Sequence, residues 1–163
     1  NRLKDIEFEG VYTSPQMRAY DTCLVISKGK NVDVVSDPRL REFGYGVWEG
    51  KLQHEVMQEN GGSIWHVRDA EPLMFYVQGG DSIAERVWET REFTSELYQK
   101  HPQGNVLVVS HGYIGRLLVV SALGMEVENI KYLRTSNCSL SILDIKGQDR
   151  YLRLYNDTSH IVI

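Results

Sequence analysis

Hydrophobic residues along the chain gather in short runs that are separated by stretches with helical spacing. The runs at residues 11–13, 32–35 and 106–109 predict β-strands, and the third run predicts a strand buried on both faces. Between these runs, apolar residues recur three or four positions apart, which predicts amphipathic helices. Strands that alternate with helices indicate an α/β fold, a three-layer sandwich in which helices flank a mostly parallel sheet.

Capping signals predict where two of the helices begin. Ser14 precedes a proline, so we expect Ser14 to cap a helix that runs from residue 15 to about residue 26. Ser82 and Glu85 have the spacing of a capping box, which predicts the start of a second helix. The other expected elements are a helix at residues 52–59, a helix after Gly112, and a hairpin of strands at residues 139–143 and 151–154.

Composition indicates one globular domain over residues 1–163. The chain is 42% hydrophobic and 25% charged, which is ordinary for a soluble protein. A net charge of −4 and the lack of a lysine or arginine run argue against a nucleic-acid surface. No apolar stretch approaches 18 residues, so no membrane partner is expected. Cys23 and Cys138 lack paired spacing, and we expect two buried, reduced thiols in a cytoplasmic protein.

The junction between the strand at 106–109 and the next helix carries a polar tripeptide, Ser110-His111-Gly112. In an open α/β sheet, the carboxyl end of a strand is where ligands bind. The following helix offers free N–H groups and the positive end of its dipole, which suit an anion. A histidine at this place can contact a phosphate in either protonation state. The alternative is a buried histidine that bonds to the backbone of a strand-to-helix loop.

Two other segments place charged residues at the ends of elements. Arg18 lies in the first turn of the first predicted helix, where its planar guanidinium suits bidentate phosphate binding; pairing with Asp21 is the alternative. Glu42 and Glu49 lie in a loop of glycines and large aromatics. Aromatic walls raise the pKa of a carboxyl group, as a general acid near neutral pH requires. Either glutamate could instead pair with an arginine or cap a helix, which for Glu49 is the helix at 52–59.

Arg18, Glu42 and His111 together offer an anion clamp, an acid and an imidazole that contacts phosphate. Such a set suits phosphoryl transfer, in which catalysis consists mostly of positioning and charge stabilisation. Histidines and acidic residues do not share a spacing typical of zinc or magnesium sites, so we expect no metal. The expected partner is a small phosphorylated substrate or inorganic phosphate.

Five short motifs, taken in order along the chain, resemble those of the histidine phosphatase superfamily, which includes phosphoglycerate mutases and many small-molecule phosphatases. Each motif is weak alone, whereas their common order is specific. The matching segments are residues 11–22 with Ser-Pro-x-x-Arg-Ala, residues 40–50, Gly79-Gly80-Asp81-Ser82 with Asp81 where the family has Glu, Ser110-His111-Gly112 with Arg116, and residues 156–160.

The resemblance implies a phosphoglycerate mutase-like fold and a reaction through a phosphohistidine. In the family, a first histidine attacks the phosphoryl group, two arginines and a second histidine bind its oxygens, and a carboxylic acid protonates the leaving group. Carried over, Arg18 is the second arginine, His111 the second histidine and Glu42 the acid. No metal or organic cofactor is implied. The remaining positions assigned to substrate binding are Ser14, Glu49 and Gly112.

The family's Arg-His-Gly motif, which bears the nucleophile and the first arginine, does not occur in residues 1–163. We expect it to precede Asn1 in a longer protein, because loss of its strand leaves ladder groups of the sheet unpaired. The leading hypothesis is then a phosphomonoester phosphatase. A cofactor-dependent phosphoglycerate mutase is the alternative, although the region between Glu42 and His111 looks compact for one. A non-catalytic phosphate-binding pseudo-phosphatase is expected only if the chain truly starts at Asn1.

Substrate choice and oligomeric state stay open at this stage. The aromatic residues Trp65, Phe75 and Tyr76 lie in a loop that either selects the substrate or contributes to the core. The sequence also leaves open whether the protein forms a homodimer.

Overall fold

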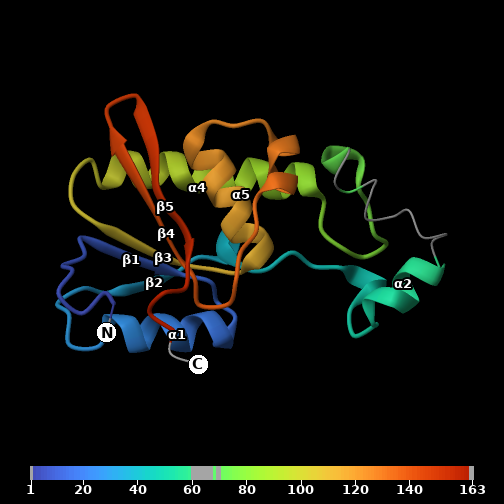
Figure 1. Ribbon diagram of the computed structural model, residues 1–163, viewed down its shortest axis with the longest axis horizontal. Coiled ribbons are helices and arrows are strands. Elements are labelled where there is room, and N and C mark those ends of the chain that lie inside the picture. The colour runs from blue at the N-terminus through green and yellow to red at the C-terminus, as the bar shows by residue number, and fades with distance from the viewer. Residues whose placement is uncertain (1, 60–67, 69–70, 162–163) are drawn as a thin grey trace.

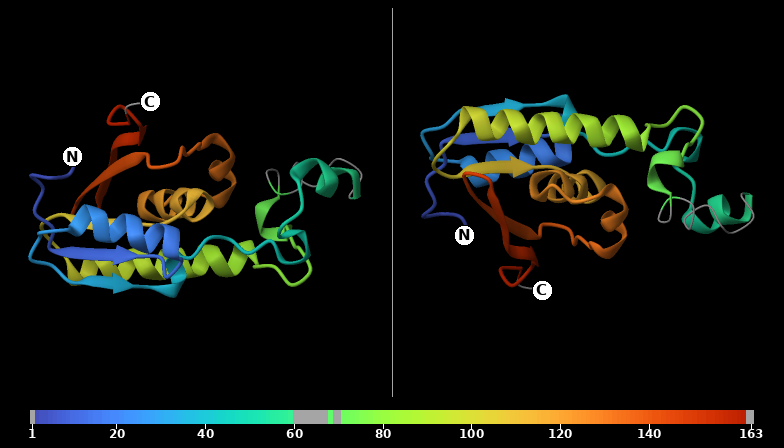
Figure 2. Two further views of the ribbon diagram at one scale, coloured as in Figure 1. Left: turned by 90° about the horizontal axis from the view of Figure 1, so that it is seen from below. Right: turned by 90° about the horizontal axis from the view of Figure 1, so that it is seen from above.

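A computed structural model describes residues 2–59, 68 and 71–161. Its strands and helices form three layers (Figure 1), as the sequence predicts. Helix α1 (Met17–Ser27) covers one face of the central sheet, and helices α4 (Ile83–Lys100) and α5 (Gly112–Leu123) cover the other. Seen from below in Figure 2, α1 accordingly lies in front of the central sheet, and seen from above α4 lies in front of it.

The central sheet is parallel, with the strand order β2-β1-β3. Its strands are β1 (Gly10–Thr13), β2 (Val34–Ser36) and β3 (Val106–Val109). Thr13 at the end of β1 is level with the last residue of β2 and of β3. The loops that follow the three strands therefore leave the sheet at one edge.

Side chains alternate between the two faces of the sheet, as the strand geometry requires. Val11 and Leu107 pack with Cys23 of α1, whereas Tyr12 packs with Phe93 of α4. The other three residues of β3 are half-buried rather than fully buried on both faces.

The predicted hairpin is confirmed as a second, antiparallel sheet of β4 (Leu140–Lys146) and β5 (Asp149–Asp157). Gly147 in its turn has a φ of 63°, which a glycine adopts without strain. Within the described residues, β3 pairs only with β1, so the opposite edge of β3 has no neighbouring strand. That edge lies next to the loop that carries His111.

Helix starts match the local signals in one case and depart from them in another. Ser82 caps α4, because its Oγ accepts a hydrogen bond from the Glu85 N–H. Ser14 does not cap α1, which begins at Met17 and not at residue 15. The shorter elements are α2 (Gln53–Glu59), which projects from the layers (Figure 1), and the 3-10 helices Pro38–Leu40 (η1), Gly46–Trp48 (η2), Pro72–Met74 (η3) and Val127–Tyr132 (η4).

Burial settles part of what the sequence leaves open. Phe75 is a core residue, 3% exposed, while Tyr76 is 68% exposed; Trp65 lies outside the described residues. Cys23 is buried as expected, but Cys138 is exposed, which corrects the expectation of two buried thiols. Among the described helices, none is both long enough and apolar enough to cross a membrane.

Candidate active site

His111 and Ser14 meet at the edge where the parallel strands end. His111 directly precedes α5, and its Nε2 lies 2.7 Å from Ser14 Oγ in a shared hydrogen bond. Ser14 is fully buried and also accepts a hydrogen bond from the Gln16 N–H. Burial lowers the pKa of His111, a shift that Glu42 opposes and Arg18 reinforces. The neutral imidazole is therefore favoured, and Ser14 holds it in place.

Glu42 binds the amino end of α5. Its carboxylate accepts hydrogen bonds from the N–H groups of Tyr113 and Ile114, both at 3.3 Å, and from its own neighbour Phe43 at 3.0 Å. The N–H groups of Tyr113 and Ile114 lie in the first turn of α5, where the positive end of the helix dipole attracts a carboxylate. A Cβ added to Gly112 would make only ordinary van der Waals contacts, at 3.5 Å from Thr135 Oγ1 and 3.8 Å from Glu42 Oε2, so the approach of Glu42 to the helix does not depend on a glycine here.

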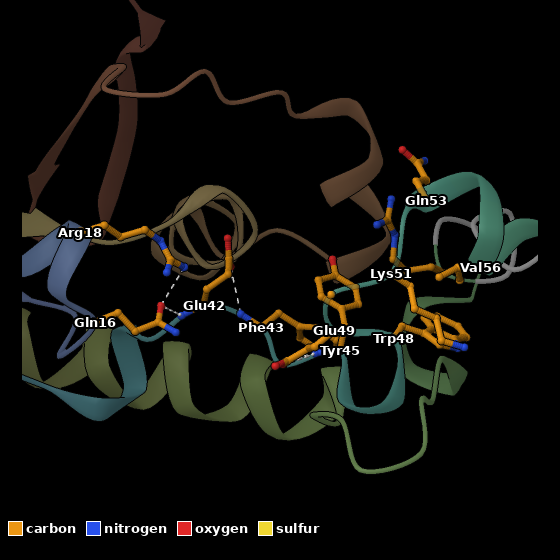
Figure 3. A pocket seen from close by; sticks show the side chains of 12 residues that line it. Gln16, Arg18, Glu42, Phe43, Tyr45, Trp48, Glu49, Lys51, Gln53 and Val56 are labelled. Atoms are coloured by element: carbon orange, nitrogen blue, oxygen red, sulfur yellow. Dashed lines mark hydrogen bonds between the residues drawn. The ribbon is translucent and has the colours of Figure 1, made fainter.

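Gln16 connects Arg18 to Glu42. Its Oε1 accepts hydrogen bonds from Arg18 Nη2 at 3.0 Å and from the Glu42 N–H at 3.2 Å, as the dashed lines in Figure 3 show. The guanidinium of Arg18 is exposed and bonds to Gln16 rather than to Asp21. The sequence gives no signal for Gln16, because its partner Glu42 is 26 positions away.

A cavity of about 570 Å³ opens beside these residues, a volume typical of sites for small molecules. Arg18 and Glu42 line one end, and aromatic rings including Trp48 line the other (Figure 3). Glu49 is in the wall, where its Oε1 accepts a hydrogen bond from the Tyr45 N–H. The hydrogen bond that Glu49 accepts comes from Tyr45 and not from α2, and the N–H of Leu52, directly before α2, bonds to Glu55.

The structure thus brings five of the six predicted residues into one connected group. Arg18, Glu42 and Glu49 line the cavity, while His111, Ser14 and Gly112 are not among its lining residues. The last three join the group through Gln16 and through the amino end of α5, whereas Glu49 lies farther along the wall (Figure 3).

Two further side chains bond to the first residue of α5. Arg116 Nε and Thr135 Oγ1 both donate hydrogen bonds to the carbonyl oxygen of Gly112, at 3.3 and 3.2 Å. Thr135 belongs to no motif of the sequence, and only its position in the fold reveals this contact. Across the described part of the chain, no three His, Cys, Asp or Glu side chains are grouped so that they could hold a metal ion.

Proteins of known activity resemble this chain over most of its length. Phosphoserine phosphatase 1 of Hydrogenobacter thermophilus is 29% identical over 151 residues, which cover 93% of this chain and 71% of that protein. A 2,3-bisphosphoglycerate-dependent phosphoglycerate mutase of Thermoplasma acidophilum is 30% identical, covering 88% and 67%.

The fold is shared with solved structures. An alpha-ribazole phosphatase from Shigella flexneri superposes with a TM-score of 0.81 at 24% identity, over 94% of this chain and 75% of that one. The family model of the histidine phosphatase superfamily (branch 1) matches residues 1–158, almost the whole chain. The chain therefore belongs to the histidine phosphatase superfamily, branch 1.

Proposed function

We propose that the protein is a phosphomonoester hydrolase that acts on a small phosphorylated metabolite through a phosphohistidine. The observation that carries this proposal is the connected group of Arg18, Glu42 and His111 beside one cavity. Related proteins named as phosphatases of phosphoserine and of alpha-ribazole support the same reaction class. The cavity volume fits a metabolite-sized phosphate ester.

Each residue has a distinct role in this proposal. Arg18 presents an exposed, planar guanidinium that binds phosphate oxygens, and His111 contributes a further hydrogen bond to them. Both interactions stabilise the charge on the phosphoryl group as it is transferred. We assign His111 to binding and not to nucleophilic attack, because the resemblance to the superfamily makes it the second, phosphate-binding histidine. Glu42 gives a proton to the leaving oxygen, and water then hydrolyses the phosphohistidine.

The nucleophile must come from elsewhere, since residues 1–163 contain no Arg-His-Gly. We propose that a strand bearing this motif pairs in parallel with the open edge of β3. Two observations support that position. The edge of β3 has no neighbour in the described chain, and parallel pairing would bring the carboxyl end of the new strand beside Ser110 and His111. The unpaired ladder groups of β3 also require a partner.

Comparing two reactions tests this function. We expect the full-length protein to hydrolyse phosphomonoesters such as p-nitrophenyl phosphate, with little interconversion of 2- and 3-phosphoglycerate. The 30% identical mutase makes interconversion the second candidate activity. Rapid interconversion with little hydrolysis would overturn the phosphatase proposal. Binding of inorganic phosphate with neither activity would support the pseudo-phosphatase. A homodimer and a cytoplasmic location stay predictions.

A further inference from the structure

The loop that carries Glu42 is held from the α4 side by a buried guanidinium. The side chain of Arg86 is 2% exposed, and its Nη2 donates hydrogen bonds to the carbonyl oxygens of Arg39 and Arg41, at 2.7 and 2.8 Å. Its Nη1 pairs with Glu89 on the same helix. A buried charge with several hydrogen bonds fixes the geometry around it. Arg86 therefore fixes the backbone just before Glu42.

Asp81 holds the same loop on the other side of Glu42. Its carboxylate accepts two hydrogen bonds from the Arg41 guanidinium, at 2.7 and 2.6 Å, and one from the Gly44 N–H at 2.8 Å. The Asp81 N–H in turn donates to the Gly44 carbonyl oxygen at 2.9 Å. Burial alone would raise the pKa of Asp81, but the bonds from Arg41 and Gly44 outweigh it and lower the pKa. Asp81 is thus held as a carboxylate.

Close backbone packing adds to these bonds. A Cβ on Gly80 would lie 2.8 Å from the Gly44 carbonyl oxygen, and one on Gly46 would lie 2.2 Å from the Gln78 carbonyl oxygen. Only glycines allow the two segments to come this close. The loop that carries Glu42 and the segment before α4 are therefore packed directly against each other.

Neither Arg86 nor Asp81 touches the proposed substrate site. Both are absent from the residues that line the cavity, and their bonds go to residues 39, 41, 44 and 89. Glu42 itself lies between Arg41 and Gly44, which both donate hydrogen bonds to Asp81. The Glu42 carboxylate accepts hydrogen bonds from the amino end of α5. The hydrogen bonds of Asp81 and Arg86 consequently set the position of the Glu42 carboxyl group relative to the phosphate-binding groups.

We propose that Asp81 and Arg86 are positioning residues that hold Glu42 where it protonates the leaving oxygen. This inference rests on the proposed phosphatase function. In the step concerned, the imidazole–phosphorus bond forms, the phosphorus–oxygen bond breaks, and the carboxyl proton of Glu42 passes to the leaving oxygen. A nitrophenolate leaves without that proton, whereas an alkoxide needs it. Misplacing the acid therefore slows only substrates with poor leaving groups.

The test compares two substrates in the full-length protein. We expect Asp81→Asn to lower kcat for an alkyl phosphate by up to about 100-fold, because small displacements of a reacting group are costly. We expect its kcat for p-nitrophenyl phosphate, and KM for both substrates, to change little. Asp81→Glu restores the carboxylate and should recover alkyl phosphate turnover. The matched control is Asp144→Asn, which removes an Asp–Arg pair in the hairpin and should spare both activities.

Equal losses on both substrates, or unchanged alkyl phosphate turnover, would overturn the inference. If Asp81→Asn unfolds by circular dichroism, Arg41→Lys gives the same comparison, because lysine cannot make the paired hydrogen bonds. Glu42→Gln tests the assignment of Glu42 as the acid separately from the positioning role of Asp81. If Glu42→Gln shows the selective loss and Asp81→Asn does not, only the positioning role fails. If Glu42→Gln is not selective either, the acid assignment of the proposed function fails.

Discussion

Replacing His111 with alanine should lower kcat by roughly 100- to 1,000-fold, the usual cost of one lost hydrogen bond to a transition-state oxygen. The imidazole stands at the amino end of α5, held by Ser14, and its pKa is lowered by burial so that the neutral ring is favoured. Alanine removes this contact and leaves the Ser14 hydroxyl with only its hydrogen bond from the Gln16 N–H. Steady-state hydrolysis of p-nitrophenyl phosphate measures the loss, which should appear with every substrate.

The exposed His54 supplies the control, since it lies on α2 and does not line the cavity. His54→Ala should retain wild-type turnover. If His111→Ala stays within a few-fold of the wild type, His111 does not bind the transferring phosphoryl group, and its place beside Ser14 is structural.

Glu42→Gln should slow formation of the phosphohistidine by roughly 100- to 10,000-fold on an alkyl phosphate, the range that general acid catalysis supplies. Glutamine keeps the size of the side chain and one oxygen that accepts from the helix N–H groups, so the loop should keep its fold. It has no acidic proton to give to the leaving oxygen. Rapid-quench measurement of the first turnover isolates this step from later hydrolysis.

Glu128→Gln, an exposed change on η4, serves as the control and should leave the first turnover unaltered. An unchanged rate for Glu42→Gln on the alkyl phosphate would refute the assignment of Glu42 as the acid.

The elements of the fold were predictable where local signals decide them. Strands β1 and β3 were predicted from short hydrophobic runs, and the start of α4 from the Ser82 cap. The start of α1 was misjudged: the helix begins at Met17, with Gln16 and not Ser14 at its N-cap position. Ser14 instead shares a hydrogen bond with His111, 97 positions away, and no local pattern reveals that contact.

The site was predictable to a similar degree. Family motifs name Arg18, Glu42 and His111, but the contacts that join them involve residues without a motif. Gln16 bridges to Glu42 across 26 positions, and Thr135 reaches Gly112 across 23. These hydrogen bonds form where separate loops come together at the edge of the sheet. No local pattern in a single sequence predicts them.

Mapping the phosphorylated residue shows which histidine attacks the substrate. The full-length protein is mixed with a ³²P-labelled phosphomonoester, quenched at alkaline pH within the first turnover, and digested for identification of the labelled peptide. We expect an acid-labile phosphohistidine in an Arg-His-Gly segment, with His111 unlabelled. Label on His111, or hydrolysis with no phosphohistidine at any time, would contradict it.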